Sequence, residues 1–232
     1  MAAYELWYWT GIPGRGEFIR LALEAAAVPY RDCARELGNE ALMADMKSRR
    51  PEPFAPPYLV ADGQVIAQTA NILAWLGRHH DLAPADEVGR ALVAQYQLTI
   101  ADMVAEAHDV HHPVGMGLYY EDQKPEAARR AEEFRDQRMP KYLQYFDRAL
   151  GDRDWLVGDR RSYADLSLFH LVKGLRFAFP KRMHSLEDEV PRVMALRERV
   201  AALPELSDYL ASDRRFPFSN GIFRYYAELD RG

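Results

Sequence analysis

A hydroxyl group at the end of the first predicted strand is the first side chain that suggests chemistry. The segment YELWYW, residues 4–9, is aromatic and alternating, which favours a strand, and Tyr8 lies near its C-terminal end. In open α/β sheets, ligands bind where this end of a strand faces the start of the next helix. A phenol there can donate a hydrogen bond to an anion, although a tyrosine on an amphipathic strand can also serve packing alone.

A proline pair and a polar helix start lie on either side of a predicted hairpin. Pro56 and Pro57 stand at the entry of a strand, where a cis bond makes a tight turn that exposes backbone groups to a peptide-like ligand. Gln68 and Thr69 open the following helix, with Thr69 expected at its N-cap. The free N–H groups and the dipole of that helix attract a carboxylate. A hydroxyl residue at an N-cap is also common in helices that bind no ligand.

The single cysteine, Cys33, limits the thiol chemistry of the chain. One cysteine excludes an intramolecular disulfide, a Cys-only zinc site and a CxxC redox motif. Thiol chemistry would therefore use Cys33 or a thiol brought in as a ligand. We place Cys33 in the second strand as a small buried hydrophobe and assign it no role.

A histidine cluster near the middle of the chain invites a metal interpretation. His108, His111 and His112 follow the i, i+3, i+4 spacing of a helix face, with Glu106 and Asp109 nearby. The remaining ligands of such a site are not evident, so we predict no metal site. We interpret the segment as part of a helix that lines a substrate groove.

Composition and charge narrow the classes of function. The 232 residues are 48% hydrophobic and 28% charged, which is typical of a globular chain rather than a disordered or fibrous one. The net charge of −5 arises from interspersed signs, so we expect no nucleic-acid partner. Without an uncharged apolar stretch of about 18 residues or a secretory signal, we expect no membrane association and a cytoplasmic location.

The elements fall into two parts joined by a short linker that holds Pro84. Residues 1–82 predict the order βαβαββα, with a hairpin turn at Asp62 and Gly63. From residue 87 to 232 no comparable strand appears, so we predict an all-helical domain. Its helices are expected at residues 88–118, 126–150, 163–179, 191–202 and 205–211. The helix at 163 is preceded by a capping box, with Ser162 as N-cap and Asp165 at N3.

Taken in order, these segments resemble the cytosolic glutathione transferases over essentially the whole chain. The resemblance is carried by YELWYW and GRGEFIRLALEAAAVPY at the start, PPYLVADGQVIAQTANILAWL in the hairpin and next helix, QLTIADM, and WLVGDRRSYADLSLF. This family pairs a thioredoxin-like α/β domain, which binds glutathione, with an all-α domain that supplies much of the second substrate's pocket. The register of YELWYW is similar to that of the tyrosine-type classes, mu, alpha, pi and sigma.

The resemblance implies roles for individual residues. Tyr8 would hydrogen-bond the glutathione sulfur and favour its thiolate, and Gln68 with Thr69 would hold the γ-glutamyl carboxylate. Asp102 would reach across a dimer interface to the γ-glutamyl amino group of the neighbouring subunit's ligand. Candidates for the glycyl carboxylate are Arg15, Lys47 and Arg50. Candidates for the acceptor site are Thr10, His111, Met116, Tyr119 and Tyr120, the last three of which could equally be packing residues.

Three departures from the family pattern bear on these roles. The loop from Tyr8 to Arg15 holds one more residue than in mu-like sequences, so Thr10 competes with Tyr8 as the hydroxyl donor; we favour Tyr8. The family's cis-proline corresponds to Pro57, and the residue before it normally offers both N–H and C=O to the ligand. Here that residue is Pro56, which has no N–H. Arg161 stands in place of the apolar residue that normally precedes the capping box.

We therefore expect a homodimeric glutathione transferase that adds the glutathione thiolate to hydrophobic electrophiles, with glutathione as cosubstrate and no metal. A glutathione-dependent isomerase or peroxidase on the same fold is the first alternative. A non-catalytic carrier of glutathione or of apolar ligands is the second. The aromatic tail beyond residue 214 either closes over the groove or fastens the C-terminus to the helical domain, and we favour the second.

Overall fold

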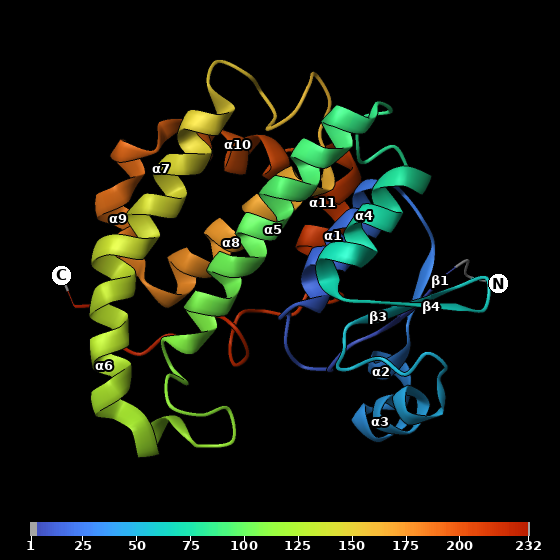
Figure 1. The fold of residues 1–232 in the computed structure, drawn as a ribbon, viewed down its shortest axis with the longest axis horizontal. Coiled ribbons are helices and arrows are strands. Elements are labelled where there is room, and N and C mark those ends of the chain that lie inside the picture. Colours follow the sequence, from blue (N-terminus) through green and yellow to red (C-terminus); the bar gives the residue numbers. More distant parts are fainter. Residues whose placement is uncertain (1–3, 232) are drawn as a thin grey trace.

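A four-stranded sheet forms the centre of the N-terminal part of the chain in the computed structural model, which describes residues 4–231 (Figure 1). β1 (Tyr4–Trp7) lies between β2 (Tyr30–Asp32) and β3 (Tyr58–Ala61), and β4 (Gln64–Ala67) flanks β3. β2 is parallel to β1, whereas β3 is antiparallel to both β1 and β4. The predicted hairpin is confirmed, with Asp62 and Gly63 both at positive φ.

Helices cover both faces of this sheet. Side chains alternate along a strand, so Leu6 and Leu59 face one core, with α1 (Gly16–Ala25) and α4 (Thr69–His79), while Trp7 faces the other. That second core is closed by α2 (Cys33–Leu37) and α3 (Asn39–Ser48). By the same alternation, the side chain of Tyr8, one residue beyond β1, lies on the face of the sheet that α1 covers.

Cys33 is a correction to the predicted second strand. The strand ends at Asp32, and Cys33 is the first residue of α2 because Ala34, Arg35, Glu36 and Leu37 are strong helix formers. The side chain is nevertheless buried, in the smaller of the two cores. Burial raises the pKa of the Cys33 thiol to about 12, so this thiol is unreactive at neutral pH.

The rest of the chain is helical, as predicted, with differences at proline residues. The helix expected over 88–118 ends at Asp109, ahead of Pro113, and the one expected over 126–150 has a π-helical turn before Pro140, which cannot donate to the preceding turn. An additional helix starts at Pro180. The elements are α5 (Glu87–Asp109), η1 (Tyr120–Gln123), α6 (Lys124–Glu133), η2 (Phe134–Arg138), α7 (Met139–Leu150), α8 (Tyr163–Ala178), α9 (Pro180–Leu186), η3 (Glu187–Glu189), α10 (Pro191–Ala201) and α11 (Pro204–Ala211).

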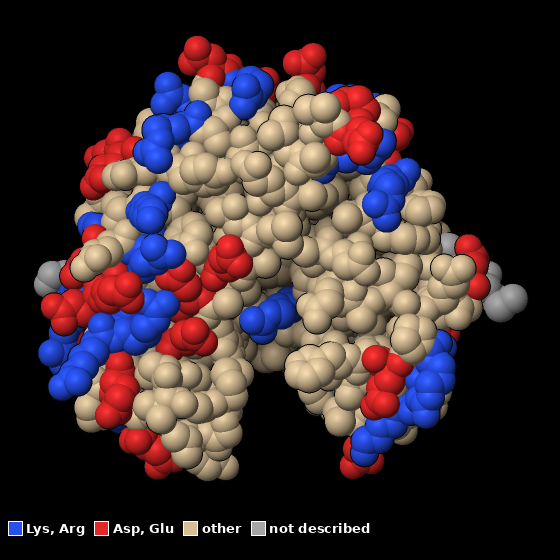
Figure 2. Space-filling view, viewed as in Figure 1, with Lys and Arg blue, Asp and Glu red and all other residues tan. Residues whose placement is uncertain are grey.

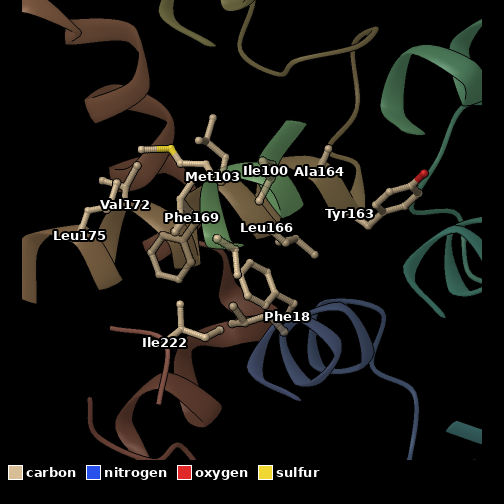
Figure 3. Packing of buried hydrophobic residues seen from close by; sticks show 14 of the residues in the cluster. Phe18, Ile100, Met103, Tyr163, Ala164, Leu166, Phe169, Val172, Leu175 and Ile222 are labelled. Atoms are coloured by element: carbon tan, nitrogen blue, oxygen red, sulfur yellow. The ribbon is translucent and has the colours of Figure 1, made fainter. Parts of the chain in front are cut away.

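α8 is the central helix of the molecule and joins the two parts through an apolar core. Figure 3 shows Phe18 of α1, Met103 of α5 and Phe169 of α8 packing together, with Ile222 of the C-terminal segment beside them. The capping box that starts α8 is confirmed, since Ser162 and Asp165 hydrogen-bond each other reciprocally. This core fixes α1, and with it the loop that follows β1, against the helical part.

The segment after α11 fastens the chain to both parts of the molecule. Arg215 contacts Glu17 of α1, and Phe218 stacks on His170 of α8. Further along, Tyr226 stacks on Tyr120, and the buried Asp230 accepts hydrogen bonds from the first N–H groups of α9. Of the two alternatives for this tail, the structure therefore shows the one in which the tail is packed against the rest of the chain.

Among residues 4–231, no helix combines the length and apolar content needed to cross a lipid bilayer.

Candidate functional site

Tyr8 lies directly after β1, with its ring packed against the loop that leads to α1. Gly14 and Gly16 make this approach possible, because a Cβ on either would lie 2.1 Å from the Tyr8 hydroxyl oxygen or 2.5 Å from its Cδ1. The hydroxyl oxygen accepts a hydrogen bond of 2.8 Å from the backbone N–H of Arg15. The loop thus holds the phenol in one position while leaving its own proton available to a ligand.

The electrostatics of Tyr8 favour a protonated phenol. Burial raises the pKa of Tyr8, and the Arg15 N–H and the charges of Arg15 and Arg20 oppose that rise only in part. At neutral pH the group is therefore a neutral hydrogen-bond donor rather than a phenolate. Such a donor stabilises an anion placed at its proton.

Thr10, the competing hydroxyl, is held differently. It lies on the turn beyond Tyr8, and its backbone N–H donates to Oδ1 of Asn39 at the start of α3 at 3.1 Å. Its side chain is half-buried. The backbone N–H of Arg15, in the loop before α1, donates its hydrogen bond to the hydroxyl of Tyr8 and not to that of Thr10.

The strand pairing brings the proline pair and Gln68 beside Tyr8. Trp7 pairs with Tyr58, and Tyr58 pairs with Ala67. Extending both registers by one residue sets Pro57 opposite Tyr8 and Gln68 opposite Pro57. The Pro56–Pro57 bond is cis, and Pro56 can offer a ligand only its carbonyl. Three segments distant in sequence therefore meet at one edge of the sheet.

The N-cap of α4 is Gln68, which corrects the prediction of Thr69. Gln68 has φ 70 and ψ 121, so the chain turns from β4 straight into helical geometry at Thr69. The Gln68 side chain makes no capping hydrogen bond, and it is exposed. The first N–H groups of α4 therefore point at the sheet edge beside Pro57, where a carboxylate would be favoured.

Arg15 and Thr69 meet at a small cavity between the two parts of the chain. Its volume is about 40 Å³, enough for one water molecule and far too small for a peptide. Asp102 follows one of the lining residues but is itself exposed on α5. The cavity is lined by Arg15, Phe18, Thr69, Gln97, Ile100, Ala101 and Val104.

The predicted cations at the end of α3 are exposed. Lys47 faces solvent, and the Arg50 guanidinium donates to the carbonyl oxygens of Lys47 and Arg49. Arg49 is the half-buried cation here, since it bridges Asp45 and Glu5. Neither Lys47 nor Arg50 is held against Tyr8 by any contact among the described residues.

An open cleft separates the helical part from the α2–α3 region, with a Lys or Arg side chain at its base (Figure 2).

The histidine cluster lies at the C-terminal end of α5, where the ring centres of His108 and His111 are 4.9 Å apart and those of His111 and His112 are 4.8 Å apart. Burial lowers the pKa of His108 to about 4 and that of His111 to about 3. These two imidazoles are therefore neutral at physiological pH.

The partners of this cluster are backbone and tail rather than carboxylates. Nε2 of His111 lies 3.0 Å from the carbonyl oxygen of Ile222. Burial would raise the pKa of Glu106, but hydrogen bonds from Arg138, Tyr142 and Arg130 lower it to about 2. Within residues 4–231, no group of three or more His, Cys, Asp or Glu residues is arranged to hold a metal ion.

The aromatic acceptor-site candidates separate in the structure. Met116 and Tyr119 are exposed on the loop after α5. Tyr120 is buried; its hydroxyl donates to Glu228 at 2.9 Å, and its ring stacks on Tyr226 at 3.8 Å. Tyr120 therefore packs against the tail, whereas Met116 and Tyr119 are free to contact a ligand.

Comparison with known proteins shows that the chain is similar to glutathione S-transferases. Residues 108–213 match the family described as "Glutathione S-transferase, C-terminal domain". Glutathione S-transferase A3 of Mus musculus is 29% identical over 89% of this chain and 89% of its own length. The chain is a glutathione S-transferase homologue. It is also 28% identical to hematopoietic prostaglandin D synthase of Gallus gallus, over 90% of this chain and 96% of that protein.

The fold of this glutathione S-transferase homologue agrees with solved structures. The Pi-class glutathione S-transferase of Onchocerca volvulus superimposes with a TM-score of 0.71 at 21% identity, covering 90% of this chain and 92% of that one. The homologue thus has a thioredoxin-like N-terminal domain followed by a helical domain, as the sequence predicted. The family match begins at His108, so it covers the helical part from the end of α5 to α11 and does not include Tyr8, its loop or α1.

Proposed function

We propose that this chain is a glutathione transferase in which Tyr8 stabilises the thiolate of bound glutathione. The observation that carries the proposal is the hydrogen bond from the Arg15 N–H to the Tyr8 hydroxyl oxygen, at 2.8 Å. Because the oxygen is already an acceptor and the phenol stays protonated, its proton is directed away from the loop. A sulfur placed at the sheet edge beside Pro57 would receive it.

The energetic demand on Tyr8 is modest. A free thiol has a pKa near ~8.5, so only a few per cent is thiolate at neutral pH. Lowering that pKa by about two units requires roughly 2.7 kcal/mol of preferential stabilisation of the thiolate. A hydrogen bond from a buried neutral donor to an anion contributes about 1.5–3 kcal/mol, which is the right size.

The peptide part of glutathione would lie along the sheet edge. The first N–H groups of α4, with Gln68 and Thr69, suit the γ-glutamyl carboxylate, and the Pro56 carbonyl suits the N–H of the ligand's cysteine. The backbone donor that the family uses at this position is lacking, because Pro56 has no N–H. One backbone hydrogen bond to the ligand is thus lost. Arg15, Lys47 and Arg50 remain candidates for the glycyl carboxylate.

The second substrate would enter the cleft between the domains. In the reaction the thiolate sulfur bonds to an electrophilic carbon, for an aryl halide with loss of halide, and the thiol proton goes to solvent. The neutral His111, the exposed Met116 and Tyr119, and the half-buried Thr10 are the candidate contacts. An apolar electrophile suits this set, and holding both reactants together supplies much of the acceleration.

The proposal includes a homodimer. Asp102 is exposed on α5, and as a ligand contact it requires a second subunit. Exposed apolar side chains on the same helix include Val88 and Leu98, and Phe54, in the loop before the proline pair, is 93% exposed. A phenylalanine with nearly its whole surface in water favours a partner that covers it.

A glutathione-dependent isomerase is the second candidate, favoured by the match to hematopoietic prostaglandin D synthase of Gallus gallus. Such an enzyme would use the same thiolate and return it at the end of each cycle. A carrier would bind glutathione without any chemistry.

The test combines the protein with glutathione and one of two electrophiles, an activated aryl halide or an organic endoperoxide. Mass spectrometry of the products and the glutathione balance distinguish the reactions. A transferase consumes glutathione and forms a thioether. An isomerase rearranges the endoperoxide with glutathione unchanged. Binding of glutathione without turnover of either substrate would contradict the proposal and favour the carrier, and Asp102→Ala should weaken glutathione binding only if the dimer forms the site.

A further inference from the structure

A cavity between α8 and α10 lies apart from the proposed glutathione site. α10 packs against α8 in the helical part of the chain. The space between the two helices has a volume of about 230 Å³, and none of the residues that line it belongs to the sheet edge beside Tyr8. The lining consists of Phe169, Lys173 and Arg176 of α8 and Arg197, Glu198 and Ala201 of α10.

Positive side chains converge on this cavity. Lys173 and Arg176 follow Phe169 at i+4 and i+7, so the three residues share one face of α8. Arg197 reaches the same cavity from α10, and all three cations are half-buried. Because they are partly shielded from solvent, water screens their mutual repulsion less than on an open surface. With Glu198 as the carboxylate of the lining, the cavity has a net charge of +2.

Lys173 is the cation of this cavity that has no carboxylate partner. The two arginines are paired, Arg176 with Glu187 and Arg197 with Glu198. Within residues 4–231, by contrast, no carboxylate oxygen lies within 4.0 Å of the Lys173 ammonium, which also makes no hydrogen bond to another residue of that range. An ammonium group has three N–H donors. The structure therefore leaves these donors for water or for a ligand.

The surroundings of Lys173 disfavour its positive charge. Burial lowers the pKa of Lys173, and the nearby charges of Arg215 and Arg197 lower it further. The carboxylate of Glu198 opposes this shift only in part. Nζ of Lys173 lies 5.5 Å from the centre of the Phe169 ring, and this cation–π contact supplies no hydrogen-bond acceptor of the ordinary kind. An anion in the cavity would offset the cost, because it would pair with the charge that the protein leaves unpaired.

We propose that the cavity between α8 and α10 binds a phosphate dianion, either free phosphate or the phosphate group of a small monoester, through Lys173, Arg176 and Arg197. The net charge of the lining matches that of a dianion. Guanidinium groups offer paired N–H donors that fit phosphate oxygens, and the ammonium adds a compact charge. The volume lies below the ~300 Å³ at which pockets for drug-sized ligands begin, so the ligand is small. This inference does not depend on the proposed function of Tyr8.

The test is titration of the full chain with sodium phosphate by isothermal calorimetry, at an ionic strength held constant with sodium chloride. We expect one site per chain with a Kd of about 0.1–1 mM, which suits a few charge-assisted hydrogen bonds at a partly exposed site. At about ten times that Kd, phosphate should raise Tm by about 3–6 °C, whereas chloride at equal ionic strength should not. Binding and a thermal shift no larger for phosphate than for chloride would overturn the proposal.

A parallel titration with glycerol 3-phosphate distinguishes the two sources of the group. Tighter binding of the monoester would identify an organic phosphate as the occupant. Tighter binding of inorganic phosphate would identify the free ion. Either result supports the site only if the binding depends on Lys173, and binding of both that is independent of Lys173 would overturn the proposal.

Lys173→Met removes the charge and keeps the apolar stem over Phe169. We expect the Kd for phosphate to rise by about tenfold to a hundredfold, which corresponds to the loss of one hydrogen bond to a charged group. Lys141→Met is the matched control, because Lys141 is exposed on α7 and outside the lining, and its loss changes the net charge equally. Its Kd should stay within about twofold of wild type. Equal weakening in both variants would overturn the proposal, since net charge rather than this cavity would then govern binding.

Glu198→Gln should change the affinity in the opposite direction. It removes the carboxylate of the lining and frees Arg197 for the ligand, so the Kd should fall by about twofold to fivefold. A rise in Kd would contradict the proposal.

Thermal unfolding in phosphate-free buffer separates binding from packing. Lys173→Met should have a Tm equal to or above that of the wild type, because it removes an unpaired, partly buried charge. A lower Tm together with an unchanged Kd for phosphate would make Lys173 a packing residue and overturn the proposal.

Discussion

The phenolic oxygen of Tyr8 accepts a hydrogen bond of 2.8 Å from the backbone N–H of Arg15. This single bond joins the end of β1 to the start of α1 and determines how the phenol is used. Its oxygen is satisfied by the protein, and its proton is left for a ligand.

Gly16→Ala should displace Tyr8. The new Cβ would lie 2.5 Å from Cδ1 of the Tyr8 ring. Because Gly16 has an ordinary helical φ, an alanine there causes no backbone strain, and any effect comes from the steric contact with the ring. We expect kcat/KM for conjugation to fall by about tenfold to a hundredfold, a loss of roughly 1.4–2.7 kcal/mol in transition-state stabilisation. Steady-state kinetics with an activated aryl halide measures it.

Gly117→Ala is the matched control, because a Cβ at Gly117 meets no atom within 4 Å. Its kinetics should equal those of the wild type. Unchanged kinetics in Gly16→Ala, with the fold intact by circular dichroism, would mean that the position of Tyr8 does not govern the rate.

Phe54→Ser should weaken the proposed homodimer. Phe54 is 93% exposed in the single chain, and burying a phenylalanine at an interface contributes about 1.5–3 kcal/mol. Sedimentation velocity over a dilution series should therefore show a dimer dissociation constant raised by about tenfold or more. Tyr119→Ser, which removes a ring that is 78% exposed on the loop after α5, should leave the constant unchanged. Equal effects of both substitutions would argue against a specific role for Phe54.

Asp165→Ala should destabilise the helical domain without affecting the proposed chemistry. The buried carboxylate accepts hydrogen bonds from the backbone N–H groups of Ser162 and Leu156, and these donors would lose their partner. We expect a loss of about 2–4 kcal/mol in the free energy of unfolding. Asp154→Ala removes an exposed carboxylate paired with Arg199 and should cost about 0–1 kcal/mol. Urea unfolding measures both, and similar losses would contradict the role of Asp165 as the buried acceptor of the capping box.

His111 should make the fold sensitive to acid. Burial lowers its pKa from 6.5 to about 3, so the unfolded chain takes up a proton first as the pH falls. Its contribution to the free energy of unfolding is therefore intact above pH 6.5 and declines as the pH falls from 6.5 toward 3. The decline is about 1.4 kcal/mol per pH unit, or roughly 3 kcal/mol at pH 4.

His111→Asn tests this. At pH 7 the variant should be less stable by about 1 kcal/mol, because the contact with the Ile222 carbonyl is lost or weakened. At pH 4 the difference should shrink or reverse, because the variant has no imidazole to protonate. The check is urea unfolding at both pH values. A stability difference that is the same at pH 7 and pH 4 would contradict the prediction.

The spacing of apolar side chains along the sequence predicted much of the fold. The alternation in YELWYW and the helical spacing around Phe18 predicted β1 and α1, and the Asp62–Gly63 turn predicted the hairpin. The boundaries were less accurate, because they depend on single residues. Pro140 introduces a π-helical turn, Cys33 precedes four strong helix formers, and the conformation of Gln68 moves the N-cap by one position.

The candidate site was predictable where it depends on strand ends and not where it depends on packing. Tyr8 follows β1 and Gln68 follows β4; both strands run antiparallel to β3, which lies between them, so their C-terminal ends are at the same edge of the sheet. Tyr120, by contrast, is buried through its stack on Tyr226 of the tail, and no sequence motif signals that contact. The half-buried cation at the end of α3 is Arg49 rather than Arg50, and the sequence has no signal that distinguishes them.

The most direct test of the account is the thiol pKa of glutathione bound to the wild type and to Tyr8→Phe, read from thiolate absorbance across a pH titration. We expect a depressed pKa in the wild type and a rise of about one to two units in the variant, equivalent to roughly 1.4–2.7 kcal/mol. Thr10→Ala, as the control, should keep the wild-type value. A depressed pKa that Tyr8→Phe leaves unchanged, or no depression in the wild type, would contradict the central claim.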